Sequence, residues 1–352
     1  MSRGKVLSIL LVGVFLFGVG QAFAAEDQSK LIEGAKKEGK VVYWTSGLTP
    51  DLIKAIEQGF KKRYGLHDFQ VVFSAARTTE QVAKVTQELR ANRLTVDIIS
   101  GAMPEFFYEL LKAGEVMKYD SPEYKHFPMV KGVCAEPGYW VGTTGMVHAV
   151  TWNPKVIKKD LATYNDLLDP QFKGIMCSGD PRKSESYLMN YLGLRKILGK
   201  DFMVKLAKQD IVWFTRAPDV TNKVATGEFP VAFMGNSRTA YVNAVEGAEI
   251  KVSFPKEGVV VLTNPFVILT KAPHPSAARL LVDYVSSEEG QRLMVEKSGY
   301  LILREGVPIP PKARPFIPPL SKINVIPIDW KSLTANEVEN TRKEFMEIFG
   351  KK

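Results

Sequence analysis

The sequence has few of the residues that support redox or metal chemistry. It contains two cysteines and four histidines in 352 residues, and neither type falls into a paired metal-ligand spacing or an HExxH motif. It also has no G-x-S-x-G sequence of the kind that presents a nucleophilic serine. We therefore predict a protein without a cofactor, a metal centre or an enzymatic activity.

Long hydrophobic runs are also scarce, and the one that approaches the length of a membrane span lies near the N-terminus. A basic start at Arg3 and Lys5 is followed by an apolar stretch over residues 6–20 and by Ala22 and Ala24, which form an A-x-A cleavage signal. The stretch is shorter than the roughly 20 residues that span a bilayer. Residues 1–24 are therefore predicted to be a cleaved signal peptide rather than an anchor. No cysteine near the cleavage site is available for a lipid, which favours a free periplasmic protein.

The chain also lacks a long basic run, although its formal net charge is +9. The cations are scattered, often in pairs such as Lys61 and Lys62, which is typical of solvated helix faces and not of a nucleic-acid binder. Export permits a disulfide between Cys134 and Cys177. Two buried free thiols are the alternative, and the sequence does not decide between them.

Short apolar segments alternate with amphipathic segments in the first third of the chain. The pattern predicts strands over residues 40–46, 69–75 and 96–100, and helices over residues 30–39, 51–65, 78–92 and 104–114. Such a βαβαβα order predicts a parallel sheet with helices on both faces.

A second α/β series follows a glycine-containing, β-rich segment over residues 138–154. Strands are predicted over residues 174–180, 210–217 and 230–236, and helices over residues 184–199 and 220–228. Residues 259–271 are again strand-like, and residues 275–299 are predicted to form one long amphipathic helical region. The segments 138–154 and 259–271 are interpreted as two crossings between lobes. The proline-rich residues 308–319 are interpreted as an extended surface strap.

The order of several stretches resembles that of a known family. These stretches are KVVYWTSG, VDIISGA, YWVGTTGMVHAVTWNP, FKGIMCSGDPRKSESY, VATGEFPVAFMGN and VILTKAPHPSAARLLVDYVSSEEGQRLM, which together span most of the mature chain. The chain resembles the type II periplasmic solute-binding proteins of ABC importers, in the extracellular solute-binding family 1 group that includes ferric-iron, sugar-phosphate and aminoethylphosphonate binders. None of the stretches is a catalytic signature, so the resemblance depends on their order.

The resemblance implies an α/β fold of two lobes, with two crossing strands and a ligand cleft between the lobes. Residues 25–145 together with 263–320 would form the first lobe, residues 146–262 the second lobe, and residues 321–352 a C-terminal helical tail. It implies a monomer that captures a small solute and delivers it to an ABC permease in the inner membrane. A sensory ligand-binding module and an exported enzyme on the same fold are the alternatives.

In open α/β sheets, ligands bind beyond the carboxyl ends of the strands, so the residues that follow each strand are candidates for the site. Hydroxyl and guanidinium groups dominate these positions, and such groups bind carboxylates, phosphates and phosphonates. Ser184 and Ser186 precede a predicted helix, where they would add to its N-terminal anion site; plain helix capping is the alternative. For the arginines the alternative is a surface ion pair. The candidate ligand-binding residues are Ser46, Arg77, Ser100, Ser184, Ser186, Arg216, Asn236, Arg238 and Tyr241.

Ferric binders of the family carry two adjacent tyrosines soon after the strand that here ends at Asn236. This chain has Ser237 and Arg238 in that neighbourhood, with Tyr241 alone downstream. A hard trivalent cation needs anionic oxygen ligands, and an arginine would repel it. A small anionic organic solute is therefore the predicted ligand, and ferric iron is the alternative. His148, in the first crossing segment, is predicted to pack or hydrogen-bond in a structural role.

Overall fold

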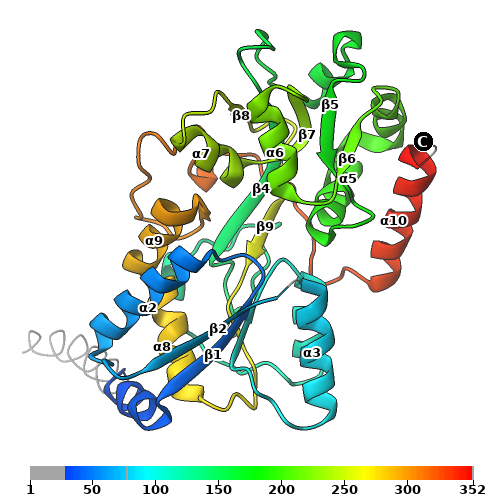
Figure 1. Cartoon of the computed structure of the whole chain (residues 1–352). Helices are drawn as coiled ribbons and strands as arrows, with labels where there is room; N and C mark the ends of the chain where they lie inside the picture. The colour runs from blue at the N-terminus through cyan, green and yellow to red at the C-terminus, as the bar shows by residue number, and fades with distance from the viewer. Residues whose placement is uncertain (1–27, 77, 351–352) are drawn as a thin grey trace, which may run out of the picture.

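The computed structural model describes residues 28–76 and 78–350 and shows two α/β units, one above the other in Figure 1. One sheet has four strands in the order β10-β3-β1-β2, and the other has seven strands built around the path β11-β4-β7-β5-β6. The predicted signal peptide and Arg77 lie outside the described residues. The predicted two-unit α/β fold is confirmed.

The first sheet joins three parallel strands and one antiparallel edge strand. The parallel strands follow the βαβαβα order that the sequence predicted, and β10 pairs with β3 in the opposite direction. Its strands are β1 (Lys40–Thr45), β2 (Gln70–Ala75), β3 (Ile98–Ser100) and β10 (Val267–Ile268). The accompanying helices are helical residues 28–38, α2 (Pro50–Tyr64), α3 (Thr78–Arg90), α4 (Pro104–Lys112), α8 (Pro275–Ser286) and α9 (Glu288–Ser298).

The second sheet contains the parallel strands of the second α/β series. Strand β5 lies between β6 and β7 and is parallel to both, and β4 pairs antiparallel with β7. Its strands are β4 (Thr144–Trp152), β5 (Met176–Gly179), β6 (Val212–Phe214), β7 (Val231–Asn236), β8 (Lys251–Ser253), β9 (Val261–Asn264) and β11 (Leu301–Ile302). Its helices are α5 (Glu185–Ala207), α6 (Ala217–Thr226), α7 (Ser237–Val245) and α10 (Ala335–Phe349). Short 3₁₀ turns occupy Tyr124–His126, Tyr164–Leu168, Pro170–Phe172 and Leu320–Lys322.

The two predicted crossing segments pair with each other. Thr144 of β4 lies opposite Asn264 of β9, and the antiparallel pairing continues to Val147 and Val261. Figure 1 shows β4 and β9 side by side where the chain passes between the two units. The crossings are therefore confirmed, whereas the residue boundaries of the two lobes remain predictions. In the part of the chain that the structure describes, no helix is both long and apolar enough to cross a membrane.

Three local predictions were wrong or incomplete. The helical region over residues 275–299 is two helices, because Ser287 is extended, donates a hydrogen bond to the Tyr284 carbonyl and caps α9 through the Gly290 N–H. The proline-rich residues 308–319 form turns rather than an extended strap, and Ala313 and Ile317 within them are buried. Helix α7 follows β7 without an intervening loop and was not predicted.

The two cysteines and His148 belong to the core. Cys134 and Cys177 are free and buried, so no disulfide joins them, and burial raises the pKa of each thiol to about 12. His148 is fully buried and stacks on the ring of Tyr187 with 4.3 Å between the ring centroids. Burial lowers the pKa of His148 to about 3, so the imidazole is neutral at physiological pH. The predicted structural role of His148 is confirmed.

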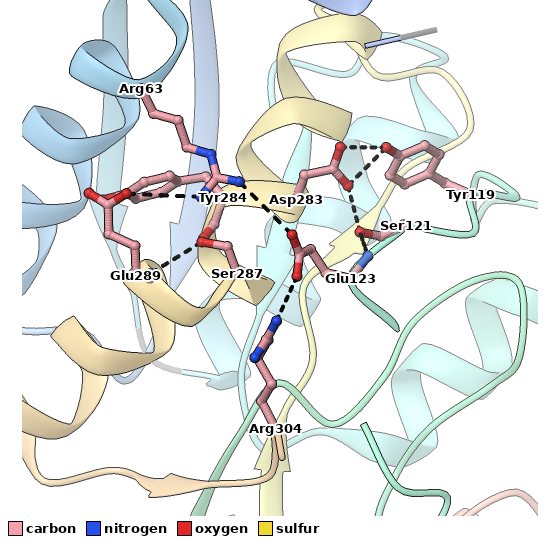
Figure 2. A network of polar contacts seen from close by, with 10 residues as sticks. Arg63, Tyr119, Ser121, Glu123, Asp283, Tyr284, Ser287, Glu289 and Arg304 are labelled. Atoms are coloured by element: carbon pink, nitrogen blue, oxygen red, sulfur yellow. Dashed lines mark hydrogen bonds and ion pairs between the residues drawn. The ribbon is translucent and has the colours of Figure 1, made fainter. Parts of the chain in front are cut away.

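A buried carboxylate joins α8 to the loop that follows α4 (Figure 2). Asp283 of α8 accepts hydrogen bonds from the Tyr119 hydroxyl at 2.8 and 2.9 Å and from the Ser121 hydroxyl at 2.5 Å. Beside it, Glu123 of the same loop pairs with Arg304 at 3.1 Å. Burial raises the pKa of Asp283 to about 6, although the two hydroxyl donors oppose that increase.

Replacing Asp283 with asparagine should make the stability of the protein less dependent on pH. The folded pKa of about 6 lies above the ordinary value of 3.8, so folding favours the protonated acid, and this stabilisation is lost as the pH rises through 6. On going from pH 4 to pH 7.5, Asp283→Asn should therefore gain about 2–3 kcal/mol relative to the parent protein, at 1.36 kcal/mol per pKa unit. Urea unfolding at the two pH values measures the difference. If the free energies of unfolding of the two proteins differed by the same amount at both pH values, Asp283 would have its ordinary pKa in the folded protein.

Candidate functional site

Three strand ends of the first sheet converge on a small group of hydroxyls. Ser46 follows β1, and its side-chain oxygen lies 3.4 Å from that of Thr78, the first residue of α3. The Ser46 N–H donates to the carbonyl of Ser100 at the end of β3. A side chain at Gly101 would place its Cβ 2.9 Å from the Ser46 oxygen, so the glycine keeps space open beside this hydroxyl. Ser46 is exposed and Ser100 is buried.

The turn between β5 and α5 holds candidate residues of the second unit. Gly179 ends β5 against the ring of Tyr187, where an added Cβ would lie 1.9 Å from two ring atoms. The buried Asp180 then accepts hydrogen bonds from the N–H and the Nε of Arg182, both at 2.8 Å. The guanidinium of Arg182 is therefore already paired. Only a glycine allows the strand to end this close to the first turn of α5.

Ser184 and Ser186 lie at the start of α5, as the sequence predicted. Ser184 is the N-cap residue, but its side chain accepts no hydrogen bond from the helix. Instead the Ser184 and Ser186 oxygens lie 3.1 Å apart, and both residues are partly exposed. The alternative of plain side-chain capping is therefore wrong for Ser184, and contact of either serine with a ligand remains a prediction.

The C-terminal helix holds this turn in place, which the sequence did not reveal. Arg342 of α10 donates to the carbonyl oxygens of Pro181 at 3.0 Å and Arg182 at 3.4 Å, and pairs with Glu185 at 3.0 Å. About 160 residues separate Arg342 from the turn in sequence. No local pattern connects segments so far apart, so only the packing of α10 on α5 identifies Arg342 as a supporting residue.

Arg216 and Asn236 follow the other two parallel strands of the second sheet. Arg216 is exposed and is the N-cap residue of α6, which has no side-chain cap. Asn236 is buried, and its side-chain oxygen accepts the Thr239 N–H at 3.0 Å, so it caps α7. Its amide nitrogen lies 3.4 Å from the Met146 sulfur. Asn236 therefore stabilises the start of α7, whereas the exposed side chain of Arg216 is available for contact with a ligand.

Arg238 connects the second unit to the first. It lies on α7, and its Nε donates to the Ser298 carbonyl at 2.6 Å, while its Nη1 donates to the Gly47 carbonyl at 3.2 Å. The guanidinium also lies 4.5 Å from the ring centroid of Tyr300. Nearby, the ring of Tyr241 packs on Gly299. Both residues lie where α7 meets the segment between α9 and β11, and their contact with a ligand remains a prediction.

Replacing Arg238 with alanine should make the two units separate more readily. The substitution removes two charge-assisted hydrogen bonds, each worth roughly 1.5–3 kcal/mol, together with the contact to the Tyr300 ring. Small-angle scattering of the solute-free variant should show a larger radius of gyration than the parent protein. Arg292→Ala is a matched control, because that arginine is exposed and pairs within α9. Identical scattering of parent and Arg238→Ala would contradict this role.

One acidic side chain at the start of α4 is buried without a partner among the described residues and has a raised pKa. Glu105 lies in the first turn of α4, and its Oε2 is buried without a hydrogen-bond partner among the described residues. Burial raises the pKa of Glu105 to about 7, and the negative charges of Glu185 and Glu109 add to the increase. Because Glu185 begins α5, the N-termini of α4 and α5 lie within electrostatic range of each other. No local sequence pattern marks Glu105 as a candidate.

Three of the helices that begin beyond parallel strands lack a side-chain cap. Helices α4, α5 and α6 follow β3, β5 and β6, and none of the three has a side-chain cap. Side chains do cap α2 and α7, which follow the parallel strands β1 and β7, as well as α9 and α10, and Glu38 accepts the first N–H groups of α8. Helix N-termini carry partial positive charge. Each unit therefore has at least one helix without a side-chain cap beyond a parallel strand, and each of these three helices carries one acidic residue in its first turn.

Comparisons with known proteins point to one family. The family model described as "Bacterial extracellular solute-binding protein" matches residues 54–315. The putrescine/agmatine-binding protein of Pseudomonas aeruginosa is 25% identical over 279 residues, which are 70% of this chain and 72% of that protein.

Solved structures support the same fold. The structure resembles the periplasmic binding protein AfuA of Actinobacillus pleuropneumoniae with fructose-6-phosphate bound, at a TM-score of 0.73, 19% identity, and coverage of 89% of this chain and 99% of that chain. It also resembles iron-bound HitA of Pseudomonas aeruginosa, at a TM-score of 0.68, 19% identity, and coverage of 88% and 99%. Within the described residues, no three His, Cys, Asp or Glu side chains are grouped so that they could hold a metal ion.

Proposed function

Because the chain belongs to the bacterial extracellular solute-binding proteins, which serve ABC importers, we propose that it captures a small anionic organic solute between its two lobes. A carboxylate, a phosphonate or a sugar phosphate has the required chemistry. The solute would contact both lobes, favour their closed arrangement and so present the surface that the permease recognises. The proposed binding step makes and breaks no covalent bond.

The observation that carries this proposal is the set of uncapped helix N-termini beyond the parallel strands. Helix α4 belongs to the first unit and helices α5 and α6 to the second, so an anion between the units would face both. The hydroxyls of Ser184 and Ser186, which contact each other, and the exposed Arg216 supply hydrogen-bond donors at two of these helices. Ser46 and Thr78 supply hydroxyls from the first unit. These donor types suit an oxyanion.

A thermal-shift screen of the exported protein tests the proposal. The protein is first unfolded and refolded to remove any bound solute, and is then exposed to carboxylates, phosphonates, sugar phosphates, ferric citrate and polyamines. A ligand at 100 times its Kd adds about 2.7 kcal/mol of stability, which raises the melting temperature clearly. A shift by an anionic organic compound supports the proposal. A shift by ferric salts alone would refute it and direct attention to Tyr241 and its neighbours.

A cationic amine is the second candidate, and Glu105 is the observation that favours it. Its buried Oε2 has no partner among the described side chains, and Glu185 adds a second negative charge nearby. An ammonium group of a solute would donate to the Glu105 Oε2, whereas Glu185 already pairs with Arg342. The similarity to a putrescine/agmatine-binding protein agrees with this candidate.

The pH dependence of binding distinguishes the two candidates. Because the pKa of Glu105 is about 7, the acid is mostly protonated at pH 6 and mostly ionised at pH 8. An anionic solute should bind more weakly as the pH rises through 7, whereas an amine should bind more tightly. Glu105→Gln should remove either dependence, and isothermal titration calorimetry at the two pH values measures it. Glu109→Gln, an exposed acid one turn along α4, is the control.

A further inference from the structure

A second cavity lies outside the region of the predicted solute site. It has a volume of about 840 Å³ and is lined by Pro128 and Val130, by Ile302 of β11 with residues 303–307 and 309, by Arg314, and by residues 319–323 and 325. This volume is within the roughly 300–1,000 Å³ that is typical of small-molecule sites. None of the candidate solute-binding residues lines it.

The walls of the cavity are mainly aliphatic. Several half-buried branched side chains line it, and all of them except Val130 pack from outside on the core of the first unit. Leaving such side chains in contact with water is unfavourable by about 25 cal/mol per Å² of apolar surface, and a hydrocarbon chain would cover them. These side chains are Val130, Val307, Ile309, Leu320, Ile323 and Val325.

The polar groups of the cavity are mostly cationic. Arg304 is 9% exposed and is held by Glu123 at 3.1 Å, as Figure 2 shows, while its Nε is buried without a partner in the described structure. Arg314 donates its Nε to the Ile309 carbonyl at 3.2 Å, which leaves its terminal nitrogens for other contacts. Lys322 is exposed at the same rim. Glu305 is the acid that lines the cavity, so positive charge is in excess.

We propose that this cavity binds an amphiphilic anion, with a hydrocarbon chain along the aliphatic wall and a carboxylate head beside Arg314 and Lys322. A purely polar anion would leave the wall uncovered, and a neutral hydrocarbon would leave the cations unpaired. Aliphatic walls with a few convergent polar groups are the usual composition of such sites. This site is separate from the proposed solute site and does not depend on it.

Titration calorimetry with decanoate, below its micelle concentration, tests the proposal. Decanoate should bind at one equivalent per chain, and decanol and decyltrimethylammonium should bind at least ten-fold more weakly. The double variant Arg314→Gln/Lys322→Gln should lose about ten-fold in decanoate affinity. Ile323→Glu, which places a negative charge in the wall, should lose more. Lys312→Gln is the control, because Lys312 is exposed nearby but does not line the cavity.

Several results would overturn the proposal. One is that decanoate shows no saturable binding, and another is that decyltrimethylammonium binds as tightly as decanoate. The third such result is an Arg314→Gln/Lys322→Gln variant that has the melting temperature of the parent and binds decanoate with unchanged affinity. Sedimentation with anionic lipid vesicles without binding of free decanoate would instead indicate a membrane surface. Decanoate binding should also survive Ser184→Ala/Ser186→Ala. Its loss there would place decanoate in the solute site.

Discussion

The double variant Ser184→Ala/Ser186→Ala should bind an anionic solute at least about 100-fold more weakly than the parent protein. Each hydroxyl can donate to an anionic oxygen, and a hydrogen bond to a charged group contributes roughly 1.5–3 kcal/mol. Neither hydroxyl caps α5 through its side chain, so their removal should leave the melting temperature of the solute-free protein nearly unchanged. Calorimetric titration with the solute found by the thermal-shift screen measures the loss.

The double variant should lose affinity for the solute while its melting temperature stays the same, and this combination separates a binding role from a structural one. Ser332→Ala is a suitable control, because Ser332 is exposed in a turn before α10 and should not affect solute binding. If the double variant bound the solute as well as the parent, the α5 N-terminus would not be the anion site. A fall in melting temperature without loss of affinity would indicate that the serines stabilise the turn only.

Gly179→Ala should be strongly destabilising and should also weaken solute binding. The new Cβ would lie 1.9 Å from two atoms of the Tyr187 ring, and this ring cannot move aside because it is fully buried and stacks on His148. Overpacking of this kind costs typically 1–3 kcal/mol, and in a chain of this length a lower melting temperature by roughly 2–4 °C follows. Relief of the overlap would shift the β5–α5 turn and with it the serines of the site.

A double-mutant cycle with Tyr187→Leu tests the cause. If the overlap with the ring is responsible, alanine at position 179 should cost clearly less in the Tyr187→Leu protein than in the parent. Differential scanning calorimetry of the four proteins measures the coupling. Additive costs would show that Gly179 is needed for its backbone conformation and not for the space beside Tyr187.

The sequence determined the order and type of most elements. Apolar segments of strand length alternate with amphipathic segments, and these local periodicities survive folding because each element buries the face that its own pattern supplies. The predicted crossing segments pair as β4 and β9. The rule that ligands bind beyond strand ends also led to Ser46, Ser184 and Ser186, which lie at such ends in the structure.

Only the tertiary structure decided which polar groups already have partners. Arg238 and Arg216 both follow a strand, yet Arg238 bonds to Ser298 and Gly47, whereas Arg216 is exposed. Asn236 likewise caps α7, a helix whose sequence carries little amphipathic pattern. Arg342, Glu105 and the cavity beside β11 were invisible in the sequence for the same reason. Their contacts join segments far apart in the chain, and only the packing of the two lobes and the C-terminal segment brings those segments together.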